Sequence, residues 1–196
     1  AYIDEHSQLS GKQTVDVGCG GGLLTEAMAA CGATVTGIDM AESALAVAKL
    51  HLQLSDVGPI RYLQCSADQL ADEELGHFDV VTCMEVLEHV PDPAALVAAC
   101  KRLSRPGGKV YLSTIKRNMN AYLFAILGAE YVLSVIPRGT HENERIIKPS
   151  ELRRWGIDSG MEFTDLKGLA YSPFSGRCHL TTNTSVDYLM QFAVPE

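Results

Sequence analysis

Two carboxylates and an imidazole stand close together in the chain, at Glu85, Glu88 and His89. Side chains of these types could hold a divalent cation between them. Histidine is also the commonest general base in enzymes, so His89 could instead take a proton from an acceptor group. The same side chains can equally satisfy hydrogen bonds within a loop. The cluster therefore leaves three alternatives open: a metal site, a proton acceptor and a structural loop.

A glycine-rich stretch is the second candidate site. It reads D-V-G-C-G-G-G from Asp16 to Gly22 and overlaps the end of the apolar segment 14–17. Glycine lets the backbone turn sharply and come close to a ligand. The dinucleotide-binding pattern G-x-G-x-x-G would need its third glycine at the position of Leu23. Taken alone, the stretch indicates no more than a tight turn between a strand and a helix.

Asp39 gives the glycines more weight, because it ends the next β-branched stretch, 33–39, and lies 23 residues after Asp16. An acidic side chain at the tip of the second strand can accept hydrogen bonds from both hydroxyls of an adenosine ribose. NAD and S-adenosylmethionine both contain this ribose. NAD also brings a pyrophosphate that needs a helix N-terminus, whereas S-adenosylmethionine brings an amino-acid tail. The two motifs together predict an adenosine-containing cofactor.

An alternation of strands and helices must position these residues. The apolar patterns predict strands over 14–17, 33–39, 60–65, 78–84 and 110–114, and helices over 23–31, 42–54 and 93–103. Asp92 and Pro93 are typical of the first positions of a helix. A further helix at 149–158 and strands at 162–171 and 185–194 complete the pattern. The alternation predicts a doubly wound, parallel α/β sheet, which binds ligands at the carboxyl ends of its strands.

Length and composition fit one globular domain over residues 1–196. The content of apolar residues, 46%, excludes a disordered chain, and the net charge of −8 argues against a general nucleic-acid binder. The six cysteines form no C-x-x-C pattern, so we expect buried free thiols in a reducing compartment. We expect no signal peptide. The chain begins at Ala1, and we expect a further segment to precede it.

The stretch 116–147 interrupts the alternation as an apolar insert. Residues 118–129 carry no charge, and the apolar character resumes after Glu130. This is marginal for a membrane span, which needs about 20 mostly apolar residues. The insert is either a buried core helix or a lid that touches the membrane, and the second interpretation predicts peripheral binding rather than spanning. Basic residues that could meet anionic lipid flank it at Lys116, Arg117 and Arg138.

The motifs resemble those of a known family. D-V-G-C-G-G-G, Asp39, Met84-Glu85 and R-P-G-G at 105–108 resemble motifs of class I S-adenosylmethionine-dependent methyltransferases. The stretches VDVGCGGGLLTEAMA, DVVTCMEVLEHVPDP, IPRGTH, KPSEL and YSPFSG together resemble the ubiquinone-biosynthesis O-methyltransferase family over essentially the whole chain. The resemblance implies a Rossmann-like fold with a seven-stranded, mostly parallel sheet, an antiparallel last strand and helices on both faces.

The resemblance also implies an activity and a set of site residues. Methyl groups would pass from S-adenosylmethionine to ring hydroxyls of a polyprenyl-hydroxyphenol and of a demethyl-ubiquinol. The catalytic candidates are Glu85, His89 and His141. Mg²⁺ is implied at Glu85, Glu88 and His89, of which the two carboxylates fit it better because Mg²⁺ prefers oxygen ligands. The residues expected to bind the cofactor are Asp16, Gly18, Gly20, Gly22, Asp39, Met40, Ser66, Ala67 and Met84.

Partners and location follow from the same resemblance. It implies a polyprenylated phenol or quinol substrate, a membrane surface and other enzymes of quinone synthesis as partners, and no nucleic acid. The expected location is cytoplasmic and peripheral to the inner membrane, or the matrix face of a mitochondrion. The family also has a cofactor-contacting arginine before the first strand, for which residues 1–12 offer no counterpart. The alternatives are a methyltransferase of another phenol or an amine, a nicotinamide oxidoreductase and a non-catalytic adenosyl-binding subunit.

Overall fold

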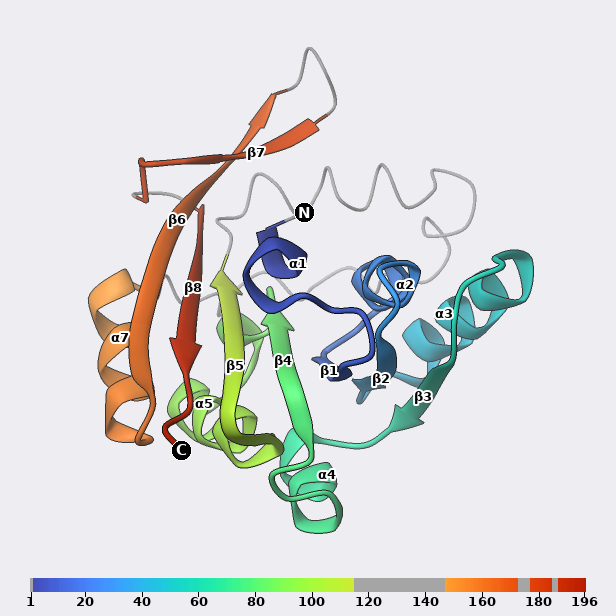
Figure 1. Ribbon diagram of the computed structural model, residues 1–196, viewed down its shortest axis with the longest axis horizontal. Coiled ribbons are helices and arrows are strands. Elements are labelled where there is room, and N and C mark those ends of the chain that lie inside the picture. Colours follow the sequence, from blue (N-terminus) through green and yellow to red (C-terminus); the bar gives the residue numbers. More distant parts are fainter. Residues whose placement is uncertain (1, 115–146, 173–176, 185–186) are drawn as a thin grey trace.

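One eight-stranded sheet runs through the part of the chain that the structure, a computed structural model, describes: residues 2–114, 147–172, 177–184 and 187–196 (Figure 1). Its strand order is β3-β2-β1-β4-β5-β8-β6-β7. The strands are β1 (Gln13–Val17), β2 (Thr34–Asp39), β3 (Ile60–Gln64), β4 (Phe78–Met84), β5 (Ser104–Thr114), β6 (Glu162–Ser172), β7 (Arg177–Thr181) and β8 (Asp187–Ala193). The helices are α1 (Tyr2–Ser7), α2 (Leu23–Ala30), α3 (Glu42–Leu54), α4 (Ala67–Glu73), α5 (Pro93–Leu103) and α7 (Pro149–Asp158), with a 3₁₀ turn η1 at Leu87–His89.

The doubly wound arrangement expected from the sequence is confirmed. Strands β1 to β5 pair in parallel, and the last strand, β8, lies antiparallel between β5 and β6. The order reverses at β1, since β2 and β3 lie on one side of it and β4 and β5 on the other. Open α/β sheets bind ligands at such a switch point, beyond the carboxyl ends of the strands.

The sheet has one strand more than the seven that the sequence predicted. The additional strand, β7, pairs antiparallel with the end of β6 alone, from Gly168 to Ser172 (Figure 1). It is five residues long, so its alternation of apolar and polar residues was too short to recognise. Strand β5 is also longer than the expected 110–114, because the chain from Ser104 already pairs with β4 across an irregular register.

Local signals explain where two of the helices begin. Asp92 caps α5 as expected, since its carboxylate accepts a hydrogen bond from the Ala95 N–H at 3.0 Å, and Pro93 takes the first helical position. Helix α4 was not predicted. Its capping box was nevertheless readable in the sequence, because Ser66 and Gln69 hydrogen-bond to each other's backbone N–H groups.

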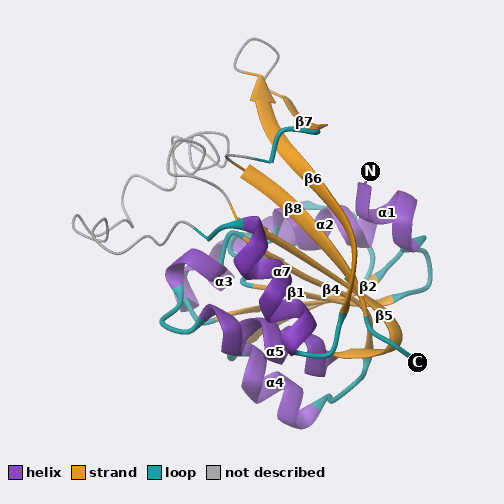
Figure 2. Ribbon diagram, turned by 90° about the vertical axis from the view of Figure 1, so that its left-hand side faces the viewer, coloured by secondary structure: helices purple, strands orange, loops and turns teal. Residues whose placement is uncertain are grey.

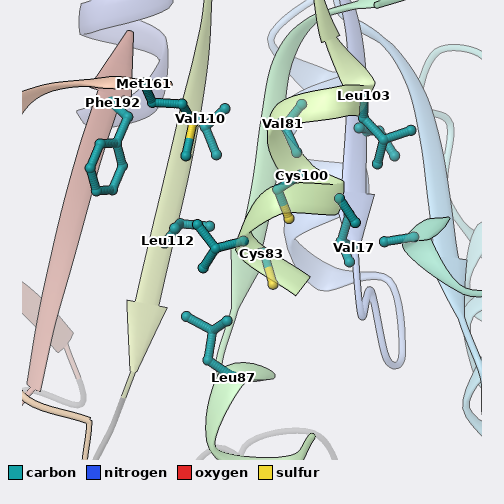
Figure 3. Packing of buried hydrophobic residues seen from close by; sticks show 14 of the residues in the cluster. Val17, Val81, Cys83, Leu87, Cys100, Leu103, Val110, Leu112, Met161 and Phe192 are labelled. Atoms are coloured by element: carbon teal, nitrogen blue, oxygen red, sulfur yellow. The ribbon is translucent and has the colours of Figure 1, made fainter. Parts of the chain in front are cut away.

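Helices cover both faces of the sheet (Figure 2). Val110 and Leu112 of β5 pack in a cluster with residues of α4, α5 and α7, whereas Tyr111 between them packs on the opposite face with residues of α1 and α2. This alternation is the two-residue period of a strand. The larger cluster contains Val17, Cys83, Cys100, Leu103 and Phe192 (Figure 3). Each fully buried large apolar side chain contributes about 1.5–3 kcal/mol to folding.

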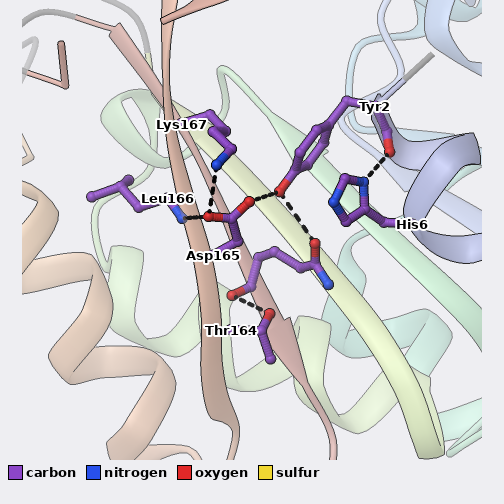
Figure 4. A network of polar contacts seen from close by, with 7 residues as sticks. Tyr2, His6, Thr164, Asp165, Leu166 and Lys167 are labelled. Atoms are coloured by element: carbon purple, nitrogen blue, oxygen red, sulfur yellow. Dashed lines mark hydrogen bonds and ion pairs between the residues drawn. The ribbon is translucent and has the colours of Figure 1, made fainter. Parts of the chain in front are cut away.

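Helix α1 is fixed to the sheet by polar contacts as well as by packing (Figure 4). The Tyr2 hydroxyl donates a hydrogen bond to Asp165 Oδ2 of β6 at 2.6 Å, and Asp165 also pairs with Lys167 at 3.2 Å. A second contact joins the hydroxyls of Ser7 and Tyr111 at 2.7 Å. The N-terminal residues therefore lie against β5, β6 and β8. No helix among the residues described is long and apolar enough to cross a membrane.

We expect Gly156→Ala in α7 to destabilise the protein, although alanine has a higher helix propensity than glycine. Alanine is about 1 kcal/mol better than glycine inside a helix. A Cβ atom at Gly156, however, would lie 2.2 Å from the buried ring of Phe192. Overpacking of this kind costs about 1–3 kcal/mol. Urea denaturation should therefore give a lower free energy of unfolding for the variant.

The control is the same change in a Phe192→Leu background. Removing the ring frees the space that the new methyl group needs, so Gly156→Ala should there be neutral or stabilising. A gain in stability from Gly156→Ala in the native background would contradict the packing argument.

Candidate active site

A pocket of about 450 Å³ opens beyond the carboxyl ends of β1 to β4, at the switch point of the sheet. Its walls come from the turn after β1, the tip of β2, the turn before α4 and the segment that follows β4. Apolar side chains of Val86, Val90 and Leu96 line part of it. Seven residues predicted from the sequence also line it: Gly18, Asp39, Met40, Ser66, Ala67, Glu85 and His89.

The loop between β1 and α2 is held against β2 by its own backbone. The N–H groups of Gly18 and Cys19 donate to the Ile38 carbonyl at 2.8 and 2.9 Å. The next donor, the Gly20 N–H, reaches Asp39 Oδ2 at 2.9 Å. The other carboxylate oxygen of Asp39 accepts from the Ala41 N–H at 2.8 Å. Asp39 therefore organises the loop, and its remaining lone pairs can still accept hydroxyl groups of a ligand.

Glycine is required at both ends of this loop for reasons of space and backbone conformation. Gly18 has a φ of +72°, and a Cβ atom there would lie 2.2 Å from Val86 Cγ2. Gly22 has a φ of +86°, and its Cβ atom would lie 2.2 Å from the hydroxyl of Tyr62. Only glycine adopts these angles without strain. Of the three glycines predicted to bind cofactor, Gly18 lines the pocket and Gly20 and Gly22 shape the loop.

Asp16 lies beneath the loop rather than in the pocket. It is 3% exposed, and its carboxyl accepts hydrogen bonds from Thr25 Oγ1 of α2 and Thr82 Oγ1 of β4, both at 2.7 Å. Burial raises the pKa of Asp16 to about 6, although both hydrogen bonds lower it. The carboxyl thus ties β1 to the start of α2 and to β4. A role in contacting cofactor stays a prediction for Asp16.

Ser66, Ala67 and Met40 lie on the side of the pocket formed by β2 and β3. Ser66 caps α4, because its hydroxyl accepts from the Gln69 N–H at 3.2 Å. Met40 is 66% exposed. A flat apolar group such as an adenine ring would cover part of it.

Glu85, which directly follows β4, is the acidic residue that lines the pocket on the side of that strand. Its backbone is left-handed, with a φ of +60°, and its Oε1 accepts a hydrogen bond from the buried Ser113 hydroxyl at 2.6 Å. Its other oxygen has no hydrogen-bond partner among the residues described. The pKa of Glu85 is raised to about 8, chiefly by burial and also by the nearby charges of Glu88 and Asp187, while the Ser113 hydrogen bond opposes the shift. Such a group is suited to accept a proton near neutral pH.

The metal set predicted from the sequence is not assembled. Within the described ranges, no group of three or more His, Cys, Asp or Glu side chains could hold a metal ion. The 3₁₀ turn separates the three side chains: Glu88 is 6% exposed and does not line the pocket, whereas His89 is exposed at its rim. Glu85, Glu88 and His89 therefore do not fit Mg²⁺ as a three-residue ligand set.

Met84 and His141 are the remaining predicted residues. Met84 is partly buried, packs against the cluster formed by α1, α2 and the sheet and does not line the pocket, and its contact with the cofactor stays a prediction. His141 lies outside the described residues, as does the insert except for its last residue, Ile147. Ile147 is buried in the main core cluster. The catalytic role of His141 stays a prediction from the sequence.

Sequence reasoning missed the hydroxyl groups that hold the acidic side chains in place. Thr25, Thr82 and Ser113 are all buried and bind Asp16 or Glu85. Thr82 stands inside the otherwise apolar strand segment V-V-T-C-M, and a polar residue there needs a buried partner. That signal was available for Thr82. Nothing in the sequence pointed from Ser113 to Glu85, because their contact depends on the pairing of β4 with β5.

Known proteins of one family are similar to this chain over nearly its whole length. A family model described as a methyltransferase domain matches residues 15–112. The chain is 55% identical over 190 residues to a ubiquinone biosynthesis O-methyltransferase of Pseudomonas paraeruginosa, covering 97% of this chain and 82% of that protein. It is 52% identical over 194 residues to the enzyme of the same name from Methylococcus capsulatus, covering 99% of this chain and 81% of that one.

Solved structures agree in fold. A magnesium protoporphyrin IX methyltransferase from Synechocystis, with bound S-adenosylmethionine, superposes with a TM-score of 0.69 at 19% identity, covering 98% of this chain and 74% of that one. A putative methyltransferase from Bacillus halodurans gives a TM-score of 0.72 at 20% identity, covering 100% and 98%. Together with the curated relatives, these matches show that the chain is an S-adenosylmethionine-dependent O-methyltransferase and belongs to the ubiquinone biosynthesis O-methyltransferase family.

Proposed function

We propose that this enzyme methylates ring hydroxyls of polyprenylated phenol and demethyl-ubiquinol intermediates. The observation that carries the proposal is the Glu85 carboxyl, which lines the same pocket as Asp39 and has one oxygen without a hydrogen-bond partner among the residues described. A phenolic hydroxyl must lose its proton to become a good nucleophile. The relatives' names supply the substrate class, a precursor of ubiquinone.

The proposed division of the pocket follows from its polar groups. Asp39 would accept the ribose hydroxyls of S-adenosylmethionine, as acidic residues at this strand tip do. Met40, Ser66 and Ala67 would surround the adenine, and the loop from Gly18 would receive the amino-acid portion. The acceptor would enter from the side of Glu85 and His89, where Val90 and Leu96 exclude water from its apolar portion.

The cofactor supplies a methyl group on a sulfonium, which leaves a neutral thioether when the methyl is transferred. The pocket's task is to align the acceptor oxygen with that methyl group, and such alignment supplies much of the acceleration. The Glu85 carboxylate would take the phenolic proton, so that the acceptor oxygen could receive the methyl group. Ser113 keeps the Glu85 carboxyl in place through its hydrogen bond. His89, exposed at the rim, is the second candidate for the base.

We also infer peripheral contact with a membrane, because a polyprenylated acceptor is dissolved in the bilayer. The inference rests on the sequence of residues 116–147, an apolar stretch flanked by Lys116, Arg117 and Arg138. Other enzymes of quinone synthesis would meet the same substrate at the same surface.

The pH dependence of the reaction tests the role of Glu85. If Glu85 is the base, it must be ionised, and burial raises its pKa to about 8. We expect kcat/KM for the acceptor to rise with pH below about 8 and to level off above it. Glu85→Gln should lower kcat/KM by about 10²–10⁴-fold and abolish this pH dependence. The control is Glu73→Gln, an exposed carboxylate on α4.

If His89→Gln removes the pH dependence while Glu85→Gln retains it, His89 is the base and the assignment to Glu85 is wrong.

Acceptor specificity tests the proposed reaction itself. The enzyme, S-adenosylmethionine and a demethyl-ubiquinol with a short isoprenoid chain should give a methyl ether on the ring, detected by mass spectrometry. A catechol without the isoprenoid chain should react at least tenfold more slowly, because it lacks the apolar portion, and an aromatic amine should not react. Calorimetry with S-adenosylhomocysteine establishes in parallel that the preparation binds cofactor. A protein that binds cofactor but methylates only the amine or the simple catechol would contradict the proposal.

Membrane contact is tested with liposomes that contain anionic lipid. The native protein should sediment with the liposomes, and changing Leu123, Phe124 and Ile126 to Ser should reduce the bound fraction, because apolar area drives interfacial binding. The matched control changes three exposed apolar residues of α3, Val47, Leu50 and Leu54, to Ser. Equal binding by the native protein and the insert variant would count against the inference.

A further inference from the structure

Tyr62 of β3 is a buried tyrosine to which the reaction assigns no role. It is 9% exposed, and its hydroxyl has no hydrogen-bond partner of normal geometry among the described residues. A buried tyrosine usually pairs its hydroxyl, so such a group needs an explanation. No hydrogen bond of normal geometry to a described residue therefore accounts for a tyrosine at this position, and the packing around its ring must be considered.

The space around Tyr62 is made by two glycines that are far apart in the sequence. A Cβ atom at Gly37 of β2 would lie 2.8 Å from the Cδ1 and Cε1 atoms of the ring. A Cβ atom at Gly22, the N-cap of α2, would lie 2.2 Å from the hydroxyl oxygen. The ring thus crosses β2 over Gly37, and its hydroxyl ends against the last residue of the glycine loop.

The side chain lies between the loop and the sheet. It packs in a small cluster with Cys19 of the loop and with Leu45 and Ala48 of α3. Hydrogen bonds from Gly18 and Cys19 to the Ile38 carbonyl draw the same loop toward β2. The loop is therefore held by backbone hydrogen bonds on one side and by the tyrosine ring and hydroxyl at its other end.

We propose that Tyr62 is a positioning residue for cofactor binding: it sets the height of residues 18–22 over the sheet and so places the Gly18 side of the pocket. Tyr62 does not line the pocket. Its effect must therefore pass through the loop to the cofactor, while the acceptor side at Glu85 and His89 is left as it is.

Substitutions that shorten the side chain test this. Tyr62→Leu removes the ring from Gly37 and the hydroxyl from Gly22, so the loop can sink toward the sheet. We expect the Kd for S-adenosylhomocysteine to rise about tenfold and the KM for S-adenosylmethionine to rise with it. At saturating S-adenosylmethionine, kcat and the KM for the acceptor should stay within about twofold. Tyr62→Phe keeps the ring and should restore most of the affinity lost in Tyr62→Leu.

A matched control separates positioning from stability. Phe78→Leu makes a similar loss of aromatic volume at the opposite, amino-terminal end of β4, where the side chain is 1% exposed. It should lower the melting temperature as much as Tyr62→Leu does, with the Kd for S-adenosylhomocysteine unchanged. Asp39→Asn, which removes a predicted ribose acceptor, serves as the positive control for lost affinity.

A double-mutant cycle tests the contact itself. Gly37→Ala places a methyl group against the ring and should weaken S-adenosylhomocysteine binding about tenfold in the native background. In a Tyr62→Ala background the same change should cost clearly less, because the ring is gone and only Cys19 Sγ, 3.1 Å from the new methyl group, remains close to it.

Three outcomes would overturn the proposal. One is Tyr62→Leu with an unchanged Kd for S-adenosylhomocysteine despite a lowered melting temperature. Another is a loss of affinity in Phe78→Leu equal to that in Tyr62→Leu, which would make the effect one of general stability. The third is additivity of Gly37→Ala and Tyr62→Ala. These readouts depend on cofactor binding alone, so they are independent of which acceptor the enzyme methylates.

Discussion

The arrangement of the site depends first on the buried carboxyl of Asp16. It lies at the end of β1 and receives hydroxyl groups from Thr25 of α2 and Thr82 of β4, so it joins the three elements that surround the start of the glycine loop. Burying a carboxyl is costly, and its pKa of about 6 reflects that cost. The two hydrogen bonds offset part of it. An apolar residue at this position would avoid the cost but would leave both hydroxyls without an acceptor.

From this point the pairing of the strands determines where the remaining groups lie. The pair Val17–Ile38 between β1 and β2 brings the Gly18 and Cys19 N–H groups to the Ile38 carbonyl and the Asp39 carboxylate to the Gly20 N–H. On the other side of β1, the pairing of Met84 with Ser113 places the Ser113 hydroxyl beside Glu85. A shift of either pairing by one residue would turn these side chains to the other face of the sheet. The positions of Asp39 at one end of the pocket and of Glu85 at the other therefore both depend on the register in which the strands pair.

The sequence predicted the features that are local and missed those that depend on pairing between distant segments. The glycine loop, the helix cap at Asp92 and the acidic tip at Asp39 are short motifs, and all were placed correctly. Met84 does not line the pocket whereas its neighbour Glu85 does, because the chain turns at the left-handed backbone of Glu85 and Met84 packs against the α1–α2 side of the sheet. The metal set failed for a similar reason, since the 3₁₀ turn buries Glu88 and exposes His89.

The glycines illustrate the limit of motif reasoning most clearly. In the sequence, their spacing indicates a backbone that approaches a ligand closely. In the structure, Gly18 makes room for Val86 and Gly22 makes room for Tyr62, so both positions are occupied by side chains of the protein itself. The same relation holds far from the pocket, where Gly156 makes room for Phe192. A glycine in such a motif can therefore make room either for a ligand or for a side chain of the protein itself. Which of the two applies depends on large side chains that lie elsewhere in the sequence and contact the glycine only in the folded sheet.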